Sequence, residues 1–135
     1  MERGATQGMM VTLVVAIVVA AVVAAGVSYL MTPRAAARTP QTVEVYMIAG
    51  DFGADTFLPG SLTAYRGDTL RIHITNTEDE DHDFTIAEFG VDTEIRPGVG
   101  NVTNVPDFVV SQVGTFAYRC NYHQPEMTGW LTVIG

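Results

Sequence analysis

The chain has 135 residues, with 7 Lys+Arg against 15 Asp+Glu and a formal net charge of −8. This length suits one domain of ordinary size and leaves little room for a second. The negative charge argues against DNA or RNA as a partner, because phosphate binding needs clustered basic side chains. The single cysteine, Cys120, excludes an internal disulfide.

The first part of the chain is apolar. No charged residue occurs between Gly4 and Pro33, and residues 9–30 are almost wholly aliphatic. As a helix this run is about 33 Å long at about 1.5 Å per residue, enough to cross a bilayer core of about 30 Å. We therefore predict one N-terminal transmembrane helix, with residues 1–31 as a membrane anchor.

A cleaved signal peptide is the alternative for this segment. Its apolar run is usually only about 7–15 residues long, which favours a retained anchor, although the small residues at 35–37 suit a signal peptidase. The arginines that flank the run, Arg3 before it and Arg34 and Arg38 after it, do not decide its orientation. We expect the domain that follows on the extracytoplasmic side, periplasmic or extracellular, because of the chemistry described below.

The rest of the chain reads as β structure. Residues 32–41 contain Pro33 and Pro40 and form a predicted linker. Beyond residue 41 no segment has a helical period, and short alternating runs recur. We predict strands over residues 42–49, 61–65, 69–76, 84–88, 108–111, 115–120 and 129–134. This pattern is typical of an all-β domain, a Greek-key sandwich or barrel, over residues 42–135.

A group of metal-binding side chains lies between the last two predicted strands. Cys120, His123 and Met127 place a thiolate, an imidazole and a thioether within eight residues. A second imidazole, His82, lies 38 residues before the cysteine. Two histidines, one cysteine and a weak axial methionine are the ligand set of a blue-copper electron-transfer centre.

Two alternatives stay open at this point. His73 competes with His82 as the distant ligand, although alternation in residues 71–74 points it away from the core. Glu126 competes with Met127 as the axial ligand, through a carboxylate oxygen.

Residues 42–135 resemble the cupredoxin family, the small blue copper proteins related to plastocyanin, azurin and amicyanin. The resemblance is carried by His82-Asp83-Phe84, by Gly-Thr-Phe-Ala-Tyr-Arg-Cys at residues 114–120 and by Met-Thr-Gly-Trp-Leu-Thr-Val at residues 127–133. It implies a cupredoxin-like fold and one type 1 copper ion. The ligands that it implies are His82, Cys120, His123 and Met127.

The resemblance also implies finer detail. Each imidazole would bind through its inner ring nitrogen, with His123 near the surface as the electron exit. Asn76 would hold the ligand-bearing segments by hydrogen bonds, a kind of support that fixes ligand orientation.

The predicted function is electron transfer without substrate turnover. No acid–base pair or nucleophile–base pair accompanies the predicted ligands. We expect a membrane-tethered carrier of single electrons in a respiratory or photosynthetic chain, with a cytochrome or a terminal oxidase as its redox partner. The alternatives are a permanent copper-bearing accessory subunit of a membrane oxidoreductase complex and a copper-binding or delivery protein.

An acidic run comes directly before His82. Residues 78–81 are Glu-Asp-Glu-Asp, and Asp83 follows the histidine. We expect these carboxylates to surround the site with negative potential and to steer a partner that docks through a basic surface.

Overall fold

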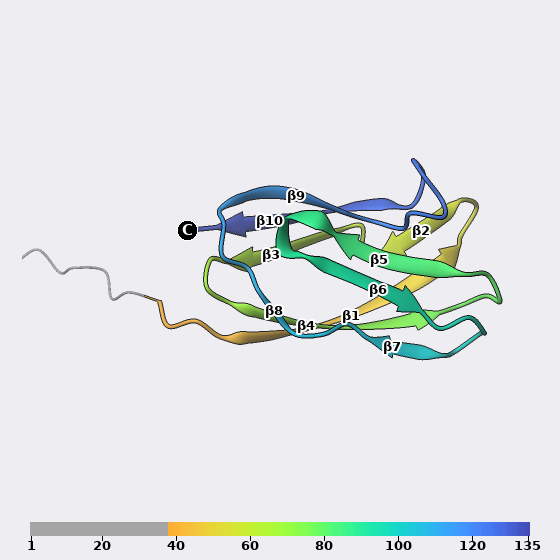
Figure 1. The fold of residues 1–135 in the computed structure, drawn as a ribbon, viewed down its shortest axis with the longest axis horizontal. Coiled ribbons are helices and arrows are strands. Elements are labelled where there is room, and N and C mark those ends of the chain that lie inside the picture. Colours follow the sequence, from red (N-terminus) through yellow and green to blue (C-terminus); the bar gives the residue numbers. More distant parts are fainter. Residues whose placement is uncertain (1–37) are drawn as a thin grey trace, which may run out of the picture. The chain divides into compact units, whose positions relative to one another are not determined.

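Residues 38–135 are the part of the chain that the computed structural model describes, and they form two five-stranded sheets (Figure 1). The first sheet contains β1 (Thr42–Asp51), β2 (Asp55–Leu58), β4 (Thr69–Asn76), β7 (Val102–Asn104) and β8 (Phe108–Val109). The second contains β3 (Ser61–Tyr65), β5 (His82–Ile86), β6 (Val91–Ile95), β9 (Gly114–Arg119) and β10 (Thr128–Ile134). The predicted all-β sandwich is confirmed.

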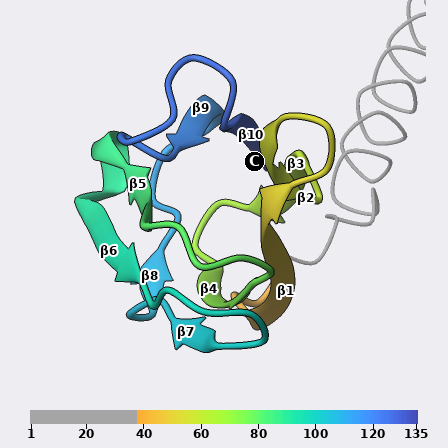
Figure 2. The same ribbon diagram turned by 90° about the vertical axis from the view of Figure 1, so that its right-hand side faces the viewer.

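The two sheets enclose one core, as the view along the strands shows (Figure 2). In the first sheet the strand order is β2-β1-β4-β7, and β8 also pairs with β4. In the second the order is β3-β10-β9-β5-β6. The pairing of β5 with β9 is antiparallel. This pairing brings the start of β5 beside the end of β9, which are the places of His82 and Cys120.

Strand alternation predicted the inward face of β4 correctly. On β4, Leu70, Ile72 and Ile74 are buried while the residues between them are partly exposed. Three short strands, β2, β6 and β7, were not predicted. On β7 the hydrophobic pattern is reversed, because Thr103 is buried and Val102 is exposed.

The predicted strand over residues 84–88 is wrong at both ends. In the structure β5 begins at His82 and ends at Ile86, and Ala87–Phe89 form a short 3-10 helix, η1. Gly90 ends this helix with a left-handed φ of 67° and donates its N–H to the Ala87 carbonyl. Residues 87 and 88, which the prediction included in the strand, therefore belong to this helical turn.

The predicted transmembrane helix lies outside the described residues, as does the linker up to residue 37. Within residues 38–135 no helix has the length and apolar character needed to cross a bilayer.

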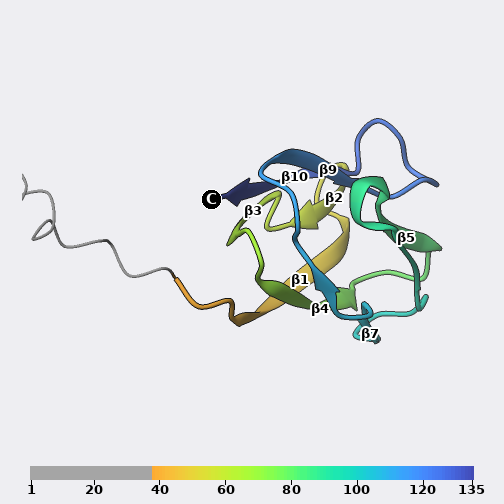
Figure 3. The same cartoon turned by 60° about the vertical axis from the view of Figure 1, so that its left-hand side comes forward.

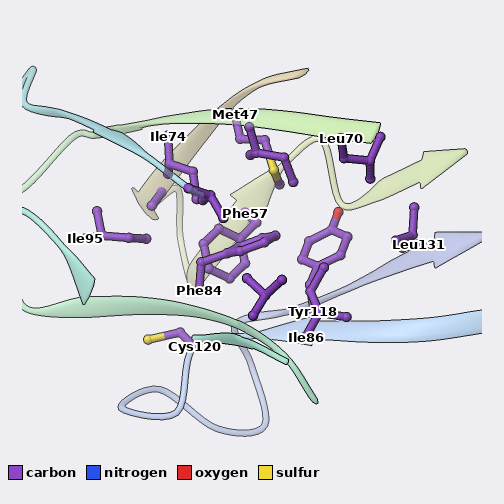
Figure 4. Close-up of a cluster of buried hydrophobic side chains, with 14 of the residues drawn as sticks. Met47, Phe57, Leu70, Ile74, Phe84, Ile86, Ile95, Tyr118, Cys120 and Leu131 are labelled. Atoms are coloured by element: carbon purple, nitrogen blue, oxygen red, sulfur yellow. The ribbon is translucent and has the colours of Figure 1, made fainter. Parts of the chain in front are cut away.

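An aromatic cluster lies at the centre of the core (Figure 4). The rings of Phe57 and Phe84 meet edge to face with centroids 5.4 Å apart, and Tyr118 lies 5.8 Å from Phe57 and 5.4 Å from Phe84. The Tyr118 hydroxyl donates to the Pro59 carbonyl at 2.6 Å, so the one polar atom of the cluster is satisfied.

Gly129 makes room for the Tyr118 ring. The two residues are paired across β9 and β10. A Cβ at position 129 would overlap the ring and hydroxyl atoms of Tyr118. The aromatic core therefore requires glycine here.

Gly129→Ala is expected to destabilise the fold by about 1–3 kcal/mol, because it forces Tyr118 out of a filled core. The measurement is urea denaturation followed by circular dichroism. Gly60→Ala is the matched control, since a Cβ there meets only the Phe57 carbonyl oxygen at 3.8 Å. Equal midpoints for the two variants would contradict the packing argument.

Candidate metal centre

Two loops meet at one end of the sandwich. The first joins β4 to β5, and the second joins β9 to β10 (at the right in Figure 1). Figure 3 shows the second loop beside the start of β5. His82 is the first residue of β5, and Cys120 directly follows β9. His123 lies within the second loop and Met127 directly precedes β10. The predicted position of Cys120, His123 and Met127 between the last two strands is thus confirmed.

Three donor atoms converge in this place. The Nδ1 atoms of His82 and His123 are 3.1 Å apart. The Cys120 sulfur lies 3.8 Å from Nδ1 of His82 and 3.5 Å from Nδ1 of His123. Cys120 and His82 are completely buried. Figure 4 shows Cys120 at the rim of the core, with its sulfur directed away from Tyr118.

The spacing of the donors fits a metal ion. A triangle with these three sides has its centre about 2 Å from each corner, close to the bond lengths of transition metals to imidazole nitrogen and thiolate sulfur. A soft thiolate with two imidazoles is also the donor set that copper accepts in both oxidation states. The residues therefore fit a copper ion in size and in chemistry.

The Asp83 carboxylate joins the two segments that carry the donors. It accepts hydrogen bonds from the Asn121 backbone N–H at 2.5 Å and from the Asn121 side-chain amide at 2.6 Å. The Thr85 hydroxyl donates to it at 3.1 Å. The Asp83 backbone N–H points at the Cys120 sulfur, 3.5 Å away.

Asp83 is therefore a structural part of the site, whereas the sequence predicted for it only a share in the negative potential around the site. Only 4% of its surface is exposed. Its position directly after His82 was the available signal. The role of Asn121, directly after Cys120, was not predicted either.

The loop from Cys120 to Met127 is closed by its own hydrogen bonds. The Cys120 N–H donates to the Met127 carbonyl at 3.0 Å, and the Met127 N–H donates to the His123 carbonyl at 2.9 Å. The Gln124 side chain donates to the Cys120 carbonyl at 2.5 Å. These bonds bring Met127 next to the cysteine. Met127 is completely buried while Glu126 is exposed, which favours the sulfur over the carboxylate as an axial ligand.

The outer nitrogens of the two imidazoles face carboxylates. His82 Nε2 lies 2.8 Å from Glu78 Oε1. His123 Nε2 lies 3.4 Å from Glu80 Oε2 and 3.9 Å from Asp55 Oδ2. Both Nδ1 atoms therefore face Cys120, in the orientation that the resemblance implied. The His123 side chain is 23% exposed, so this ring reaches the surface while His82 does not.

His73 lies away from the site. Its Nδ1 pairs with Asn104 Oδ1 at 2.7 Å, and its ring stacks on Tyr46 at a centroid distance of 4.9 Å. Both contacts belong to the first sheet, whereas the donors extend from the second. The structure thus removes the alternative to His82.

Asn76 holds the loop that leads to His82. Its buried side chain donates to the carbonyls of Glu80 and Arg96 at 3.3 and 3.2 Å and accepts from the Glu78 N–H at 3.1 Å. The expected support is thus present for the first ligand-bearing loop. The link to the second loop is made by Asp83 instead.

A family model for the cupredoxin-like domain matches residues 14–133. The chain belongs to this family. Three solved structures share the fold at 16–21% identity. The metal-binding domain of the Cu(I)-exporting P-type ATPase CopA from Streptococcus pneumoniae D39 matches with a TM-score of 0.58 and 17% identity, over 70% of this chain and 87% of that one.

The second structure is auracyanin A, a blue copper protein of the green photosynthetic bacterium Chloroflexus aurantiacus. It has a TM-score of 0.55 and 16% identity, over 68% of this chain and 98% of that one. The third is the copper nitrite reductase of Nitrosomonas europaea, with a TM-score of 0.58 and 21% identity, over 69% of this chain and 41% of that one. Cupredoxin-like domains thus occur in an enzyme as well as in small copper proteins.

Burial changes the pKa of the Cys120 thiol in this cupredoxin-like domain. Desolvation raises the pKa of the Cys120 thiol above its ordinary value, and backbone N–H groups of Asp83, Tyr122 and His123 oppose the shift. The net pKa is raised, so the side chain is a neutral thiol at neutral pH. A metal that binds the sulfur must displace this proton.

Metal binding is therefore expected to strengthen as the pH rises, by up to about tenfold per pH unit for the Cys120 proton alone. Proton release on titration with Zn²⁺, which has no redox chemistry, measures this dependence. Cys120→Ser should release about one proton fewer than the wild type, because a metal-bound thiol is deprotonated outright. Equal proton release from both proteins would contradict the role of the cysteine.

Proposed function

We propose that this cupredoxin-like domain binds one copper ion at a type 1 site and transfers single electrons. The observation that carries the proposal is the meeting of one cysteine sulfur and two imidazole Nδ1 atoms within 3.1–3.8 Å. Met127, buried at the end of the same loop, is proposed as the weak axial ligand.

The protein's own residues suit electron transfer in two ways. Asp83 and Asn121 fix the two segments against each other, so the three donors keep their places when the charge at the site changes. The complete burial of His82 and Cys120 keeps water from two of the three donors. Copper, when bound, supplies a one-electron couple between its two oxidation states. His123, partly exposed, is the proposed exit for the electron.

The site also suits a carrier better than an enzyme. Each carboxylate hydrogen-bonded at the site is engaged with a ligand or with its strand: Glu78 with His82, and Asp83 with Asn121 and Thr85. Neither carboxylate is therefore available to act as an acid or a base on a substrate. We therefore propose that the chain is not itself an enzyme.

The apolar run at residues 9–30 supports a membrane tether. We propose that it anchors the domain on the extracytoplasmic side, where redox complexes of a respiratory or photosynthetic chain present their docking surfaces. A tether raises the effective concentration of the domain toward membrane partners. The proposed partner is a cytochrome or a terminal oxidase.

The oxidised, copper-loaded chain is expected to show an intense visible charge-transfer band from the thiolate to the metal. Cys120→Ser should abolish the band, while His73→Ala, which removes an imidazole from the other sheet, should leave it intact. The measurement is a visible absorption spectrum with copper quantified in the same sample. A band that survives in Cys120→Ser would overturn the assignment.

Two further measurements separate the carrier from its alternatives. Gentle detergent extraction that leaves the chain with large haem-bearing subunits would support an accessory subunit. Facile copper release without a reversible voltammetric wave would support a delivery protein. A free, reversibly redox-active chain is the outcome that we expect.

Two carboxylates face the partly exposed ring of His123. We define Asp55 and Glu80 as the acidic face. Glu80 is 64% exposed and Asp55 is 28% exposed, and both face His123 Nε2. Charges at this position steer a basic partner toward the proposed electron exit.

Glu80→Gln combined with Asp55→Asn is expected to slow electron transfer to a cytochrome with a lysine-rich surface at low ionic strength. The difference should shrink as salt is added, because screening weakens steering between exposed charges. Stopped-flow kinetics over a salt series measures both effects. Glu88→Gln is the control, because Glu88 lies in η1, past the opposite end of β5 from His82. Identical salt dependence in all three proteins would rule out steering by this face.

A further inference from the structure

Glu78 makes the shortest contact to a candidate ligand at its outer nitrogen. Its Oε1 atom lies 2.8 Å from Nε2 of His82, which is four residues further along the loop. The His82 side chain is completely buried and the Glu78 side chain is only 22% exposed. The carboxylate is therefore a largely enclosed hydrogen-bond acceptor, unlike the other acidic side chains of the same run.

The backbone of Glu78 is held on both sides. Its N–H donates to the buried side chain of Asn76 at 3.1 Å, and its carbonyl accepts from the Gly98 N–H at 3.0 Å. Its side chain passes close to Gly50 of β1, where an added Cβ would lie 3.5 Å from the carboxylate oxygen. The contact with His82 is thus built by the fold on either side of the loop.

We propose that Glu78 is a positioning residue that fixes the proton of His82 and favours the oxidised state of the site. This inference rests on the proposed copper site. A carboxylate at 2.8 Å accepts a hydrogen bond from Nε2–H. The proton is then on the outer nitrogen, and the lone pair of Nδ1 faces Cys120 and His123. The bond also holds the ring plane.

The negative charge adds an electrostatic effect. A carboxylate near the metal stabilises the more positive of its two oxidation states. Because Glu78 is mostly enclosed, salt screens this interaction less than it screens exposed charges. At His123 the nearest carboxylate oxygens are 3.4 and 3.9 Å away and belong to more exposed side chains. The two imidazoles therefore differ: Glu78 acts on His82 at hydrogen-bond distance, and the acidic face acts on His123 through a screened field.

The first test needs no copper. In the metal-free chain, ¹⁵N NMR of the imidazole nitrogens should show His82 protonated at Nε2 and unprotonated at Nδ1. In Glu78→Ala this preference should weaken or be lost. A His82 that carries its proton on Nδ1 in the wild type would overturn the proposal, whatever the metal content of the protein.

The second test compares Glu78→Gln with Asp79→Asn in the copper-loaded chain. Both variants remove one negative charge, but Asp79 is not among the hydrogen-bond or ion-pair partners of the two imidazoles in the described residues. We expect Glu78→Gln to lower the affinity of the site for Cu(II) relative to Cu(I) by roughly tenfold. This is the lower end of the range for loss of a hydrogen-bond partner of a metal ligand. For a one-electron couple this is a rise of about 59 mV in midpoint potential. Asp79→Asn should move the potential by much less, and the shift in Glu78→Gln should persist at high salt.

The outcomes distinguish a failure of the proposed copper site from a failure of the role proposed for Glu78. Absence of the visible band in the wild type counts against the copper site itself. An intact band with equal potentials in Glu78→Gln and Asp79→Asn overturns the role of Glu78 alone. Should Glu78→Gln fail to hold copper, the nitrogen shifts of the metal-free wild type and Glu78→Ala decide the question.

Discussion

The pairing of β5 with β9, completed by the Asp83 carboxylate, is the interaction on which the site depends. The strands bring His82 and Cys120 to the same end of one sheet. Beyond the backbone pair of Thr85 and Arg119, the Asp83 carboxylate joins the two segments by two short hydrogen bonds from Asn121. The donors therefore have fixed places because the sheet and this carboxylate fix the backbone on either side of them. The remaining donor, His123, comes from a short loop that closes on Met127.

The sequence predicted what is local and missed what depends on distant contacts. Alternation in β4 identified the buried Leu70 and Ile72 and turned His73 outward. The predicted strand began only at Phe84, whereas β5 begins at His82, and His82, Asp83 and Phe84 are all buried. The carboxylate of the buried Asp83 accepts hydrogen bonds from Asn121, 38 residues away. No local pattern contains that information, so the sequence predicted for Asp83 only a contribution to the negative potential around the site.

The two imidazoles have different roles in the proposed site. His82 is enclosed and bonded to Glu78, and it ties the proposed metal to the interior of the fold. His123 is partly exposed and faces the two carboxylates of the acidic face, and it connects the same donors to the surface. One sheet end thus provides both two completely buried donors and one donor ring that is partly exposed to a partner. The proposed electron-transfer function requires this combination.

X-ray absorption at the copper edge of the purified, copper-loaded chain tests the central claim most directly. The account predicts one sulfur and two imidazole nitrogens at short distances of about 2 Å, with any second sulfur longer and weaker. A copper ion surrounded only by nitrogen and oxygen, with no short bond to sulfur, would contradict it.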